Sequence, residues 1–249
     1  MFPISVVIVT KNEESNIEDA LKSVADAKEI IVVDSFSTDR TVDICRRYTD
    51  RVYQHEWQGF ALQKQTAVDY AEGPWVLILD ADERVTPELK AEVLKNIHGT
   101  DVNGFYMPRE NYFIGKRIRH GGWWPDHTLR LFKKDRGRLG PREVHESVIV
   151  EGGTAYLKNP LRHYTYRSVS DFMERMERYS TLAAKEIIKN SGRAGLISLV
   201  IKPPFTFLKM YFLRLGFLDG TRGFMLAVLY SFYTFLKYAK TWERQEDKS

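Results

Sequence analysis

The stretch Trp75-Val76-Leu77-Ile78-Leu79-Asp80-Ala81-Asp82-Glu83 decides the fold. Its first five residues are all apolar, which is typical of a strand buried on both faces, as in a parallel sheet. The strand is followed by two aspartates that are separated by one residue. Carboxylates at this spacing suit Mg²⁺ or Mn²⁺, with phosphate as a source of further ligands. The alternative interpretation is a solvated acidic turn.

Strands and helices alternate around this stretch. Apolar, β-branched runs predict strands at residues 4–9, 30–33 and 51–54. A capping-box pattern at 15–18 predicts one helix, and Ser37 or Thr38 is expected to cap a second helix that ends near Tyr48. Further helices are expected at 61–71 and after Thr86-Pro87. The alternation predicts the α/β class, with an open, mostly parallel sheet covered by helices on both faces.

Polar clusters follow three of the predicted strands. They are Thr10-Lys11-Asn12-Glu13, Asp34-Ser35 and Asp80-Ala81-Asp82. Sheets of this kind bind ligands outside the carboxyl ends of their strands, so the three clusters are expected to share one edge. The sequence therefore predicts a nucleotide and metal site there. A nucleotidyltransferase would carry a glycine-rich loop after the first strand, and the loop at 10–13 contains no glycine.

Composition indicates which class of partner and which redox compartment to expect for the protein. A net charge of +4 over 249 residues is a mild basic excess that gives no reason to expect a nucleic-acid partner. The single cysteine, Cys45, excludes an internal disulfide and fits a reducing compartment. Its apolar neighbours favour a small buried hydrophobic residue over a nucleophile. The chain opens without the basic leader of a secretion signal.

The later parts of the chain have different patterns. Short antiparallel strands are expected near 128–132 and 147–150, and Ser168 is expected to cap a long helix that ends near Asn190. Residues 196–240 carry six basic residues against Asp219 alone, mixed with Phe, Tyr and Leu. This mixture is typical of a C-terminal helical extension that lies in a membrane interface. The longest uncharged stretch has 14 residues, fewer than the roughly 20 that span a bilayer. The alternatives are an ordinary core helix pair and a dimer interface.

Three segments together resemble the family 2 glycosyltransferases of the GT-A fold. They are residues 6–14 (VVIVTKNEE), 33–41 (VDSFSTDRT) and 79–83 (LDADE), which follow the family's order and spacing. Phe36 stands where the family usually has glycine. The resemblance implies a nucleotide-sugar-binding half at 1–100, an acceptor-binding half at 101–190 and a basic amphipathic helical extension at 191–249.

Four later segments resemble a bacterial branch of that family. They are residues 123–126 (WWPD), 130–132 (RLF), 144–146 (VHE) and 216–220 (GFLDG). That branch adds sugars to the inner core of lipopolysaccharide and includes β-1,4-glucosyltransferases. The resemblance implies an inverting, metal-dependent transfer of a sugar, with glucose favoured, from a UDP-sugar to a glycolipid. A divalent cation, Mg²⁺ or Mn²⁺, would stabilise the departing diphosphate.

The resemblance also assigns residues to the donor site. Asp82 becomes the direct metal ligand, and Asp80 would hold the ribose and metal-bound water. The nucleotide-sugar contacts expected in total are Thr10, Asn12, Glu13, Asp34, Lys64, Asp80, Ala81 and Arg130. For Lys64 the other interpretation is a solvated helix lysine, and for Arg130 it is a surface salt bridge. His163 is a candidate third metal or diphosphate contact, or a structural histidine.

Inverting transfer needs one general base near the acceptor hydroxyl. Glu146 is the favoured candidate by its position in the chain, and Asp126 is the second. Trp123 and Trp124 either stack on sugar rings or fill a core.

The expected location is the inner face of the cytoplasmic membrane, with residues 196–240 as the contact surface. The sequence does not decide whether the protein forms a homodimer. Two functional alternatives also remain: a transferase that uses another nucleotide-linked or lipid-phosphate donor, and a non-catalytic membrane-bound scaffold. The intact pair Asp80 and Asp82 argues against the scaffold.

Overall fold

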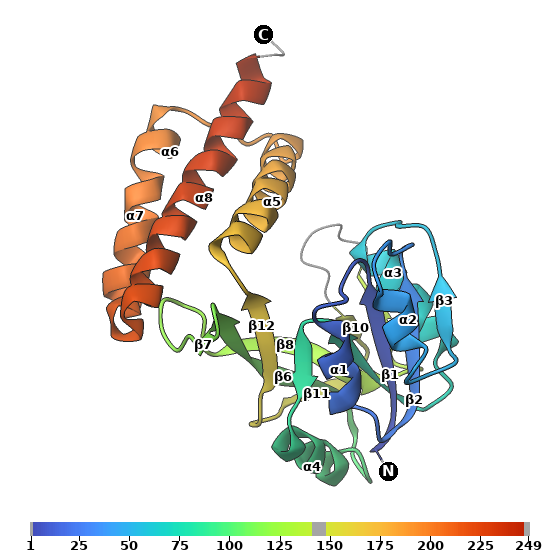
Figure 1. Ribbon diagram of the computed structural model, residues 1–249. Coiled ribbons are helices and arrows are strands. Elements are labelled where there is room, and N and C mark those ends of the chain that lie inside the picture. The colour runs from blue at the N-terminus through green and yellow to red at the C-terminus, as the bar shows by residue number, and fades with distance from the viewer. Residues whose placement is uncertain (1, 141–147, 247–249) are drawn as a thin grey trace. The chain divides into compact units, whose positions relative to one another are not determined.

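The computed structural model describes residues 2–140 and 148–246 (Figure 1). The chain forms two compact units. The first comprises Met1–Arg109 and His127–His163, and the second comprises Glu110–Asp126 and Tyr164–Ser249.

The first half of the chain supplies alternating strands and helices. In order they are β1 (Phe2–Thr10), α1 (Ile17–Ser23), β2 (Ala27–Asp34), α2 (Thr41–Cys45), β3 (Val52–Gln54), α3 (Phe60–Tyr70), β4 (Trp75–Asp80), β5 (Glu83–Val85) and α4 (Pro87–Asn96). Then follow β6 (Val102–Phe113), β7 (Lys116–Arg117), β8 (Asp126–Lys133), β9 (Gly137–Leu139), β10 (Val148–Val150), β11 (Gly153–Tyr156) and β12 (Leu161–Tyr166).

The large sheet has the order β3-β2-β1-β4-β8-β6-β12-β5, and β7 and β11 pair with β6. The strands β3, β2, β1 and β4 run parallel to one another. β8 runs antiparallel to β4, and β10 pairs antiparallel with β9 in a separate small sheet. The predicted parallel sheet and the two later antiparallel strands are therefore confirmed.

The central strands are buried on both faces, as their apolar runs predict. In β4, Leu77 and Leu79 pack in a core with residues of α1, α2 and α4. Val76 and Ile78 point to the other face and pack with residues of α3. Fully burying one such side chain contributes roughly 1.5–3 kcal/mol, so the central strands form a rigid base for the polar residues at their ends.

Two helix starts differ from the sequence predictions. The N-cap of α1 is Asn16, and its side chain makes no capping hydrogen bond, so the expected capping box is wrong. Helix α2 begins only at Thr41 and ends at Cys45. Ser37 and Thr38 do not cap it, because their hydroxyl groups donate to the side-chain oxygens of Asp34 and Asn12 instead.

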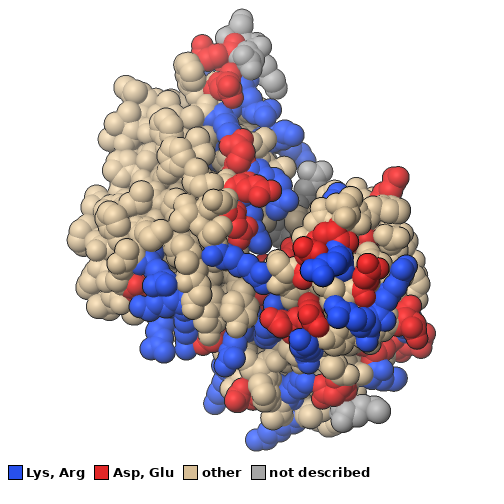
Figure 2. Space-filling model, in the orientation of Figure 1, with Lys and Arg blue, Asp and Glu red and all other residues tan. Residues whose placement is uncertain are grey.

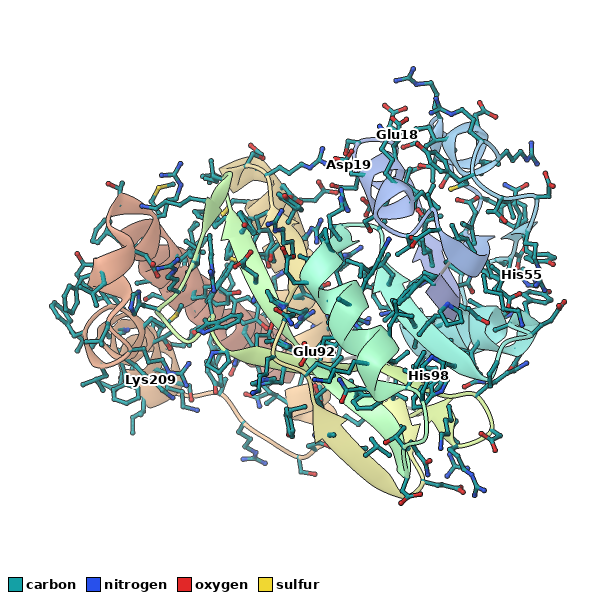
Figure 3. All side chains as sticks on the ribbon, turned by 90° about the horizontal axis from the view of Figure 1, so that it is seen from below. Glu18, Asp19, His55, Glu92, His98 and Lys209 are labelled. Carbon is teal, nitrogen blue, oxygen red and sulfur yellow. The ribbon has the colours of Figure 1, made fainter. Side chains whose placement is uncertain are left out.

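Helix α4 begins as predicted and also holds the chain that enters β12. Oγ1 of Thr86 accepts a hydrogen bond from Leu89 N at 3.1 Å, which confirms Thr86 as the cap. Glu92, labelled on α4 in Figure 3, accepts hydrogen bonds from the backbone N–H groups of Lys158 and Asn159. β12 then pairs antiparallel with β5, which places His163 opposite Glu83.

The second unit is mainly helical. Its helices are α5 (Val169–Lys189), α6 (Leu196–Val200), α7 (Lys202–Leu208), the π-helix η1 (Lys209–Leu213), the 3₁₀ helix η2 (Gly216–Asp219) and α8 (Thr221–Glu246). Ser168 caps α5 by accepting a hydrogen bond from Asp171 N at 3.0 Å, as predicted. Helix α8 packs against α5 and α7, and Phe113 and Trp123 contribute to the same core.

Candidate active site

The three predicted polar clusters lie side by side at one edge of the sheet. Thr10 at the end of β1 is the register partner of Asp34 at the end of β2. On the other side of β1, Val9 is the register partner of Asp80 at the end of β4. The parallel pairing therefore brings residues from three separate segments to one edge, as the strand order requires.

Asp34 organises the loop that follows β2. It is fully buried, and its carboxylate accepts hydrogen bonds from Ser37 N at 2.9 Å and Gln54 Nε2 at 3.2 Å. The hydroxyl of Ser37 also donates to Asp34. These contacts hold the carboxylate at a fixed position at the sheet edge.

The loop after β1 is tied to the loop after β2. Oδ1 of Asn12 accepts from Thr38 N at 2.8 Å, and Glu13 N donates to Thr41 Oγ1 at 2.8 Å. Oε2 of Glu13 accepts from Asn16 Nδ2 at 2.7 Å. The residues expected around the base and ribose thus belong to one hydrogen-bonded pair of loops.

Thr10 differs from its neighbours. Among the residues that the structure describes, its buried Oγ1 has no hydrogen-bond partner. Buried polar atoms are usually paired, so an unpaired one at a sheet edge indicates a place where a ligand or water completes the bonding.

The acidic box at the end of β4 contains a buried ion-pair network. Nζ of Lys64, from α3, lies 2.9 Å from Oδ1 of Asp80, and Arg130, from β8, binds Oδ2. Oε1 of Glu83 accepts from Arg130 Nη2 at 2.9 Å, and its Oε2 accepts from Asp80 N at 3.0 Å. Arg109 Nη1 lies 3.8 Å from Glu83. The side chains of Lys64 and Arg130 are only 3 % and 8 % exposed, so neither is a solvated surface group.

This network fixes the protonation state of Asp80. Burial alone would raise the pKa of Asp80, but the positive charges of Arg130 and Lys64 outweigh it and hold the pKa well below its usual range. Asp80 is therefore an anion throughout the physiological pH range. Its two oxygens already bind one lysine and one arginine.

Arg84 fixes the backbone of the acidic box. Its guanidinium donates to the carbonyl oxygens of Ala81 at 2.9 Å, Glu83 at 2.8 Å and Asn16 at 2.8 Å. The side chain of Ala81 packs into the core, so this residue presents only its backbone to the site. Arg84 thus connects the acidic box to the segment before α1.

Asp82 and His163 form the part of the site that fits a divalent cation. Oδ2 of Asp82 lies 3.4 Å from Nε2 of His163, and both side chains are almost fully buried. In the described part of the chain, no group of three or more His, Cys, Asp or Glu side chains could hold a metal. A carboxylate and an imidazole fit Mg²⁺ or Mn²⁺ only if phosphate oxygens and water complete the coordination, which is how Mg²⁺ is usually bound.

A cavity of about 160 Å³ lies on the α3 face of the sheet beside this network. Lys64 and Arg130 line it, together with Tyr106, His127 and Thr128 and the apolar side chains Ile78, Leu129, Leu139 and Val148. Two buried cations and several hydrogen-bonding groups make this cavity suitable for an anionic or hydroxylated ligand.

Of the two candidate general bases, the structure describes only Asp126. Asp126 belongs to the second unit, where its Oδ2 accepts from Asn111 Nδ2 at 3.1 Å. The same amide group donates to Trp123 O at 3.1 Å. Glu146 lies outside the described residues.

The two tryptophans before Asp126 have different surroundings. Trp123 is buried among Phe113, Tyr166 and Tyr230, so it fills the aromatic core of the second unit. Trp124 is half-buried beneath the guanidinium of Arg117, which lies 4.9 Å from its ring.

Three residues of the network were not expected from the sequence. Glu83 belongs to the quoted acidic box, but its full burial gives it a structural role that the motif does not reveal. Arg109 carries no spacing signal, because its partner Glu83 lies on another segment. Arg84 binds backbone carbonyl oxygens, which do not depend on the residue type of the partner. The one available signal for Arg84 is an arginine directly after an acidic box at a strand end.

Sequence comparison with known proteins finds glycosyltransferases. Residues 5–165 match the sequence model of glycosyl transferase family 2. The lipopolysaccharide core biosynthesis glycosyltransferase LpsC of Rhizobium meliloti is 30 % identical over 260 residues, covering 99 % of this chain and 94 % of the relative. An uncharacterized glycosyltransferase of Rickettsia typhi is 31 % identical over 257 residues, covering 96 % of this chain and 87 % of the relative.

Solved structures share the fold. The S. aureus TarS crystal structure superposes with a TM-score of 0.51 and 17 % identity over 99 % of this chain and 55 % of TarS. A TarS 1–349 structure in complex with UDP gives a TM-score of 0.50 and 16 % identity over 99 % of this chain and 92 % of that chain. This likeness confirms the GT-A fold that the sequence predicts.

Proposed function

The chain belongs to glycosyl transferase family 2, and we propose that it transfers a sugar from a UDP-sugar to a membrane glycolipid with inversion at the sugar carbon. The observation that carries the proposal is the register of Thr10, Asp34 and Asp80 at one sheet edge. It supports a site in which a nucleotide lies across the strand ends, with its diphosphate toward the acidic box.

The residues divide into a nucleotide part and a diphosphate part. Thr10, Asn12, Glu13 and Asp34 would contact the base and ribose, since Thr10 and Asp34 end β1 and β2 and Asn12 and Glu13 lie in the loop that follows β1. Lys64 and Arg130 are positive and nearly buried, and Asp80 already holds their side chains in place. They would therefore place positive charge near the diphosphate with little further loss of side-chain entropy. Asp80 holds both cations in position and would contact the ribose.

Asp82 and His163 would hold the divalent cation. Their two donor atoms leave most coordination positions to the diphosphate and water. When bound there, Mg²⁺ or Mn²⁺ would supply positive charge that stabilises the departing diphosphate.

The acceptor hydroxyl must lose a proton as the new bond forms. Glu146 is the favoured general base and Asp126 is the second candidate. Asp126 already accepts a hydrogen bond from Asn111, which would orient its carboxylate.

The relative of Rhizobium meliloti favours lipopolysaccharide core as the acceptor class, because its name places it in lipopolysaccharide core biosynthesis. We propose glucose as the donor sugar and the inner face of the cytoplasmic membrane as the location. TarS, whose structure in complex with UDP shares the fold of this chain, supports a uridine nucleotide as the donor.

Calorimetric titration of UDP into the protein, with and without Mn²⁺, tests the donor site. We expect binding that Mn²⁺ strengthens, followed by UDP release when UDP-glucose and a truncated lipopolysaccharide acceptor are supplied. UDP binding without turnover of any UDP-sugar would favour a non-catalytic scaffold. The absence of UDP binding in both conditions would favour another nucleotide or a lipid-phosphate donor.

A further inference from the structure

The second unit carries most of the exposed apolar side chains of the protein. Of the twenty-three large hydrophobic side chains that are exposed in the described part of the chain, sixteen lie between Leu196 and Trp242. The largest exposed fractions are 77 % at Leu196 and 73 % at Ile197 and Leu213. Figure 2 shows a wide uncharged area over α6 and α7 at its upper left. An apolar patch of this extent indicates contact with another molecule.

The helices beneath this patch are fixed to each other by polar contacts on their inner sides. Ser231 Oγ, in α8, donates to the carbonyl oxygen of Pro203, in α7, at 2.8 Å. The hydroxyl oxygens of Thr206 and Thr234 lie 3.2 Å apart between the same helices. Because the hydrogen-bonding side chains point inward, the apolar side chains are left on the outer surface.

Helix α8 extends the patch. Its exposed residues Phe224, Val228, Phe232 and Phe235 follow a spacing of four, four and three, which places them on one side of the helix. The ring of Phe224 lies 5.9 Å from the ring of Phe207, in α7. The stripe on α8 therefore meets the surface of α7.

The exposed charged side chains between residues 196 and 240 are all basic. Asp219 is the only acidic residue from 196 to 240. It is buried, and its carboxylate accepts hydrogen bonds from the backbone N–H groups of Arg119 and His120. Lys202, Lys209 (labelled in Figure 3) and Arg214 are exposed. Residues 196–240 therefore expose apolar side chains and cations to solvent, and the exposed carboxylates of α8, Glu243 and Glu246, lie beyond this stretch.

We propose that the apolar surface of α6, α7 and α8 docks into one leaflet of a membrane that contains anionic lipids. Lys202, Lys209 and Arg214 would contact headgroup phosphates while the neighbouring Leu, Ile and Phe side chains enter the acyl region. Long basic side chains can extend to the headgroups from an apolar surface, which makes this mixture suitable for the interface.

The surface lies along the leaflet and does not cross the membrane. Residues Leu196–Leu213 are apolar and long enough to qualify as a membrane span by composition. However, although the helical backbone continues through Ile201 between α6 and α7, Pro203 and Pro204 remove two backbone donors at the start of α7. Pro203 and Met210 are buried against the rest of the unit, so one side of the stretch is already covered.

A second copy of this chain fits the surface less well. In a dimer through this surface, the basic side chains of the two copies would face one another. Asp219 is buried and cannot pair with them. A bilayer with anionic headgroups supplies the missing negative charge over the whole surface.

Flotation of the full chain with lipid vesicles tests the inference, and the assay contains neither donor nor acceptor. Its failure would therefore leave the proposed transfer reaction untouched. We expect binding to vesicles of phosphatidylethanolamine and phosphatidylglycerol, and much weaker binding to pure phosphatidylcholine. Leu213→Glu should weaken binding at least about tenfold, because a charge replaces a leucine that would be buried. The matched control is Leu62→Glu, at a residue 57 % exposed on α3 of the first unit, and it should bind like the wild type.

A fluorescent label gives a second readout that does not depend on the folding of a charged variant. Burial raises the pKa of the Cys45 thiol to about 12, so this cysteine should not react with a maleimide dye. A polarity-sensitive dye on Leu213→Cys should shift to the blue with anionic vesicles, and the same dye on Leu62→Cys should not. Failure of the wild type to float, or equal shifts at both positions, would overturn the proposal. So would a lipid-free dimer that Leu213→Glu converts to a monomer, because the surface would then serve a second copy.

Discussion

The ammonium group of Lys64 lies 2.9 Å from Oδ1 of Asp80, so a helix lysine and a strand-end aspartate form a nearly buried ion pair. Arg130 binds the other oxygen of the same carboxylate. Asp80 thus joins α3, β4 and β8 at the sheet edge where the nucleotide is proposed to bind. Because the two cations are held by an anion that stays ionised, they are positioned before any ligand arrives.

Removing the lysine should destabilise the fold. In Lys64→Met, Asp80 keeps Arg130 but loses one partner, and we expect a loss of about 1–3 kcal/mol in the free energy of unfolding. Urea unfolding at neutral pH measures this change. The exposed Lys95, on α4, gives the matched control Lys95→Met, which should stay within about 0.5 kcal/mol of the wild type. Equal effects of the two variants would show that the ion pair contributes nothing to stability.

The lowered pKa of Asp80 predicts how stability depends on pH. A carboxylate with a folded-state pKa below the unfolded value, about 3.9, contributes its full stabilisation above that value and loses it as the pH falls below it. The wild type should therefore be more stable than Asp80→Asn at neutral pH, and the difference should shrink from about pH 5 to about pH 3. Urea midpoints at several pH values give this comparison. A constant difference would contradict the assigned ion pairs.

The metal assignment predicts a specific loss. Asp82→Asn and His163→Ala should each weaken the Mn²⁺-dependent part of UDP binding by at least about tenfold, while binding of UDP without metal stays close to that of the wild type. Calorimetry with and without Mn²⁺ separates the two parts. Asp135→Asn, at an exposed turn of the same unit, is the control and should leave both unchanged. Retention of the full Mn²⁺ effect in Asp82→Asn would exclude this residue as the ligand.

The two candidate bases can be separated by kinetics. Glu146→Gln should lower kcat by about 10²–10⁴ with little change in UDP affinity, because a general base acts in the chemical step. Asp126→Asn should have the smaller effect on kcat. Thermal unfolding of both variants serves as the control, since Asp126 also accepts a hydrogen bond from Asn111. The reverse order of kcat values would assign the base to Asp126.

Phe36 adopts a backbone conformation that suits glycine. Its φ is 55°, and its side chain is 52 % exposed, so it gains little from burial. We expect Phe36→Gly to stabilise the protein by about 0.5–1 kcal/mol, because the left-handed conformation costs a residue with a Cβ more than it costs glycine. Phe36→Ala keeps the Cβ and should bring no such gain. Urea unfolding of both variants checks this, and a destabilised Phe36→Gly would mean that the aromatic ring holds the loop.

Local signals in the sequence were most reliable where one residue and its near neighbours complete the structure. Thr86 and Ser168 cap their helices as predicted, because each cap needs only a hydroxyl and an N–H group three residues later. Ser37 and Thr38 have the same chemistry, but their hydroxyl groups donate to Asp34 and Asn12 instead. A hydroxyl that finds a better acceptor on another loop does not cap a helix, and the sequence does not reveal such competition.

In the candidate site, too, the sequence predicted local features but not the contacts between distant segments. The sequence predicted that Thr10, Asp34 and Asp80 would share an edge, because parallel strands that alternate with helices bring their carboxyl ends together. It left two interpretations open for Lys64 and Arg130. The structure shows both side chains nearly buried against Asp80, which excludes a solvated lysine and a surface salt bridge.

The sequence by itself determined the central strands, their parallel arrangement and the edge at which the polar residues gather, because hydrophobic periodicity and strand-end chemistry are short-range properties of the chain. Only the tertiary structure decided which charges pair, that His163 lies beside Asp82, and that Asp219 is buried while the apolar side chains of α6 to α8 remain exposed. These relationships join residues far apart in the chain. They depend on how close the fold brings side chains and how much water it leaves between them, and the linear pattern carries neither quantity.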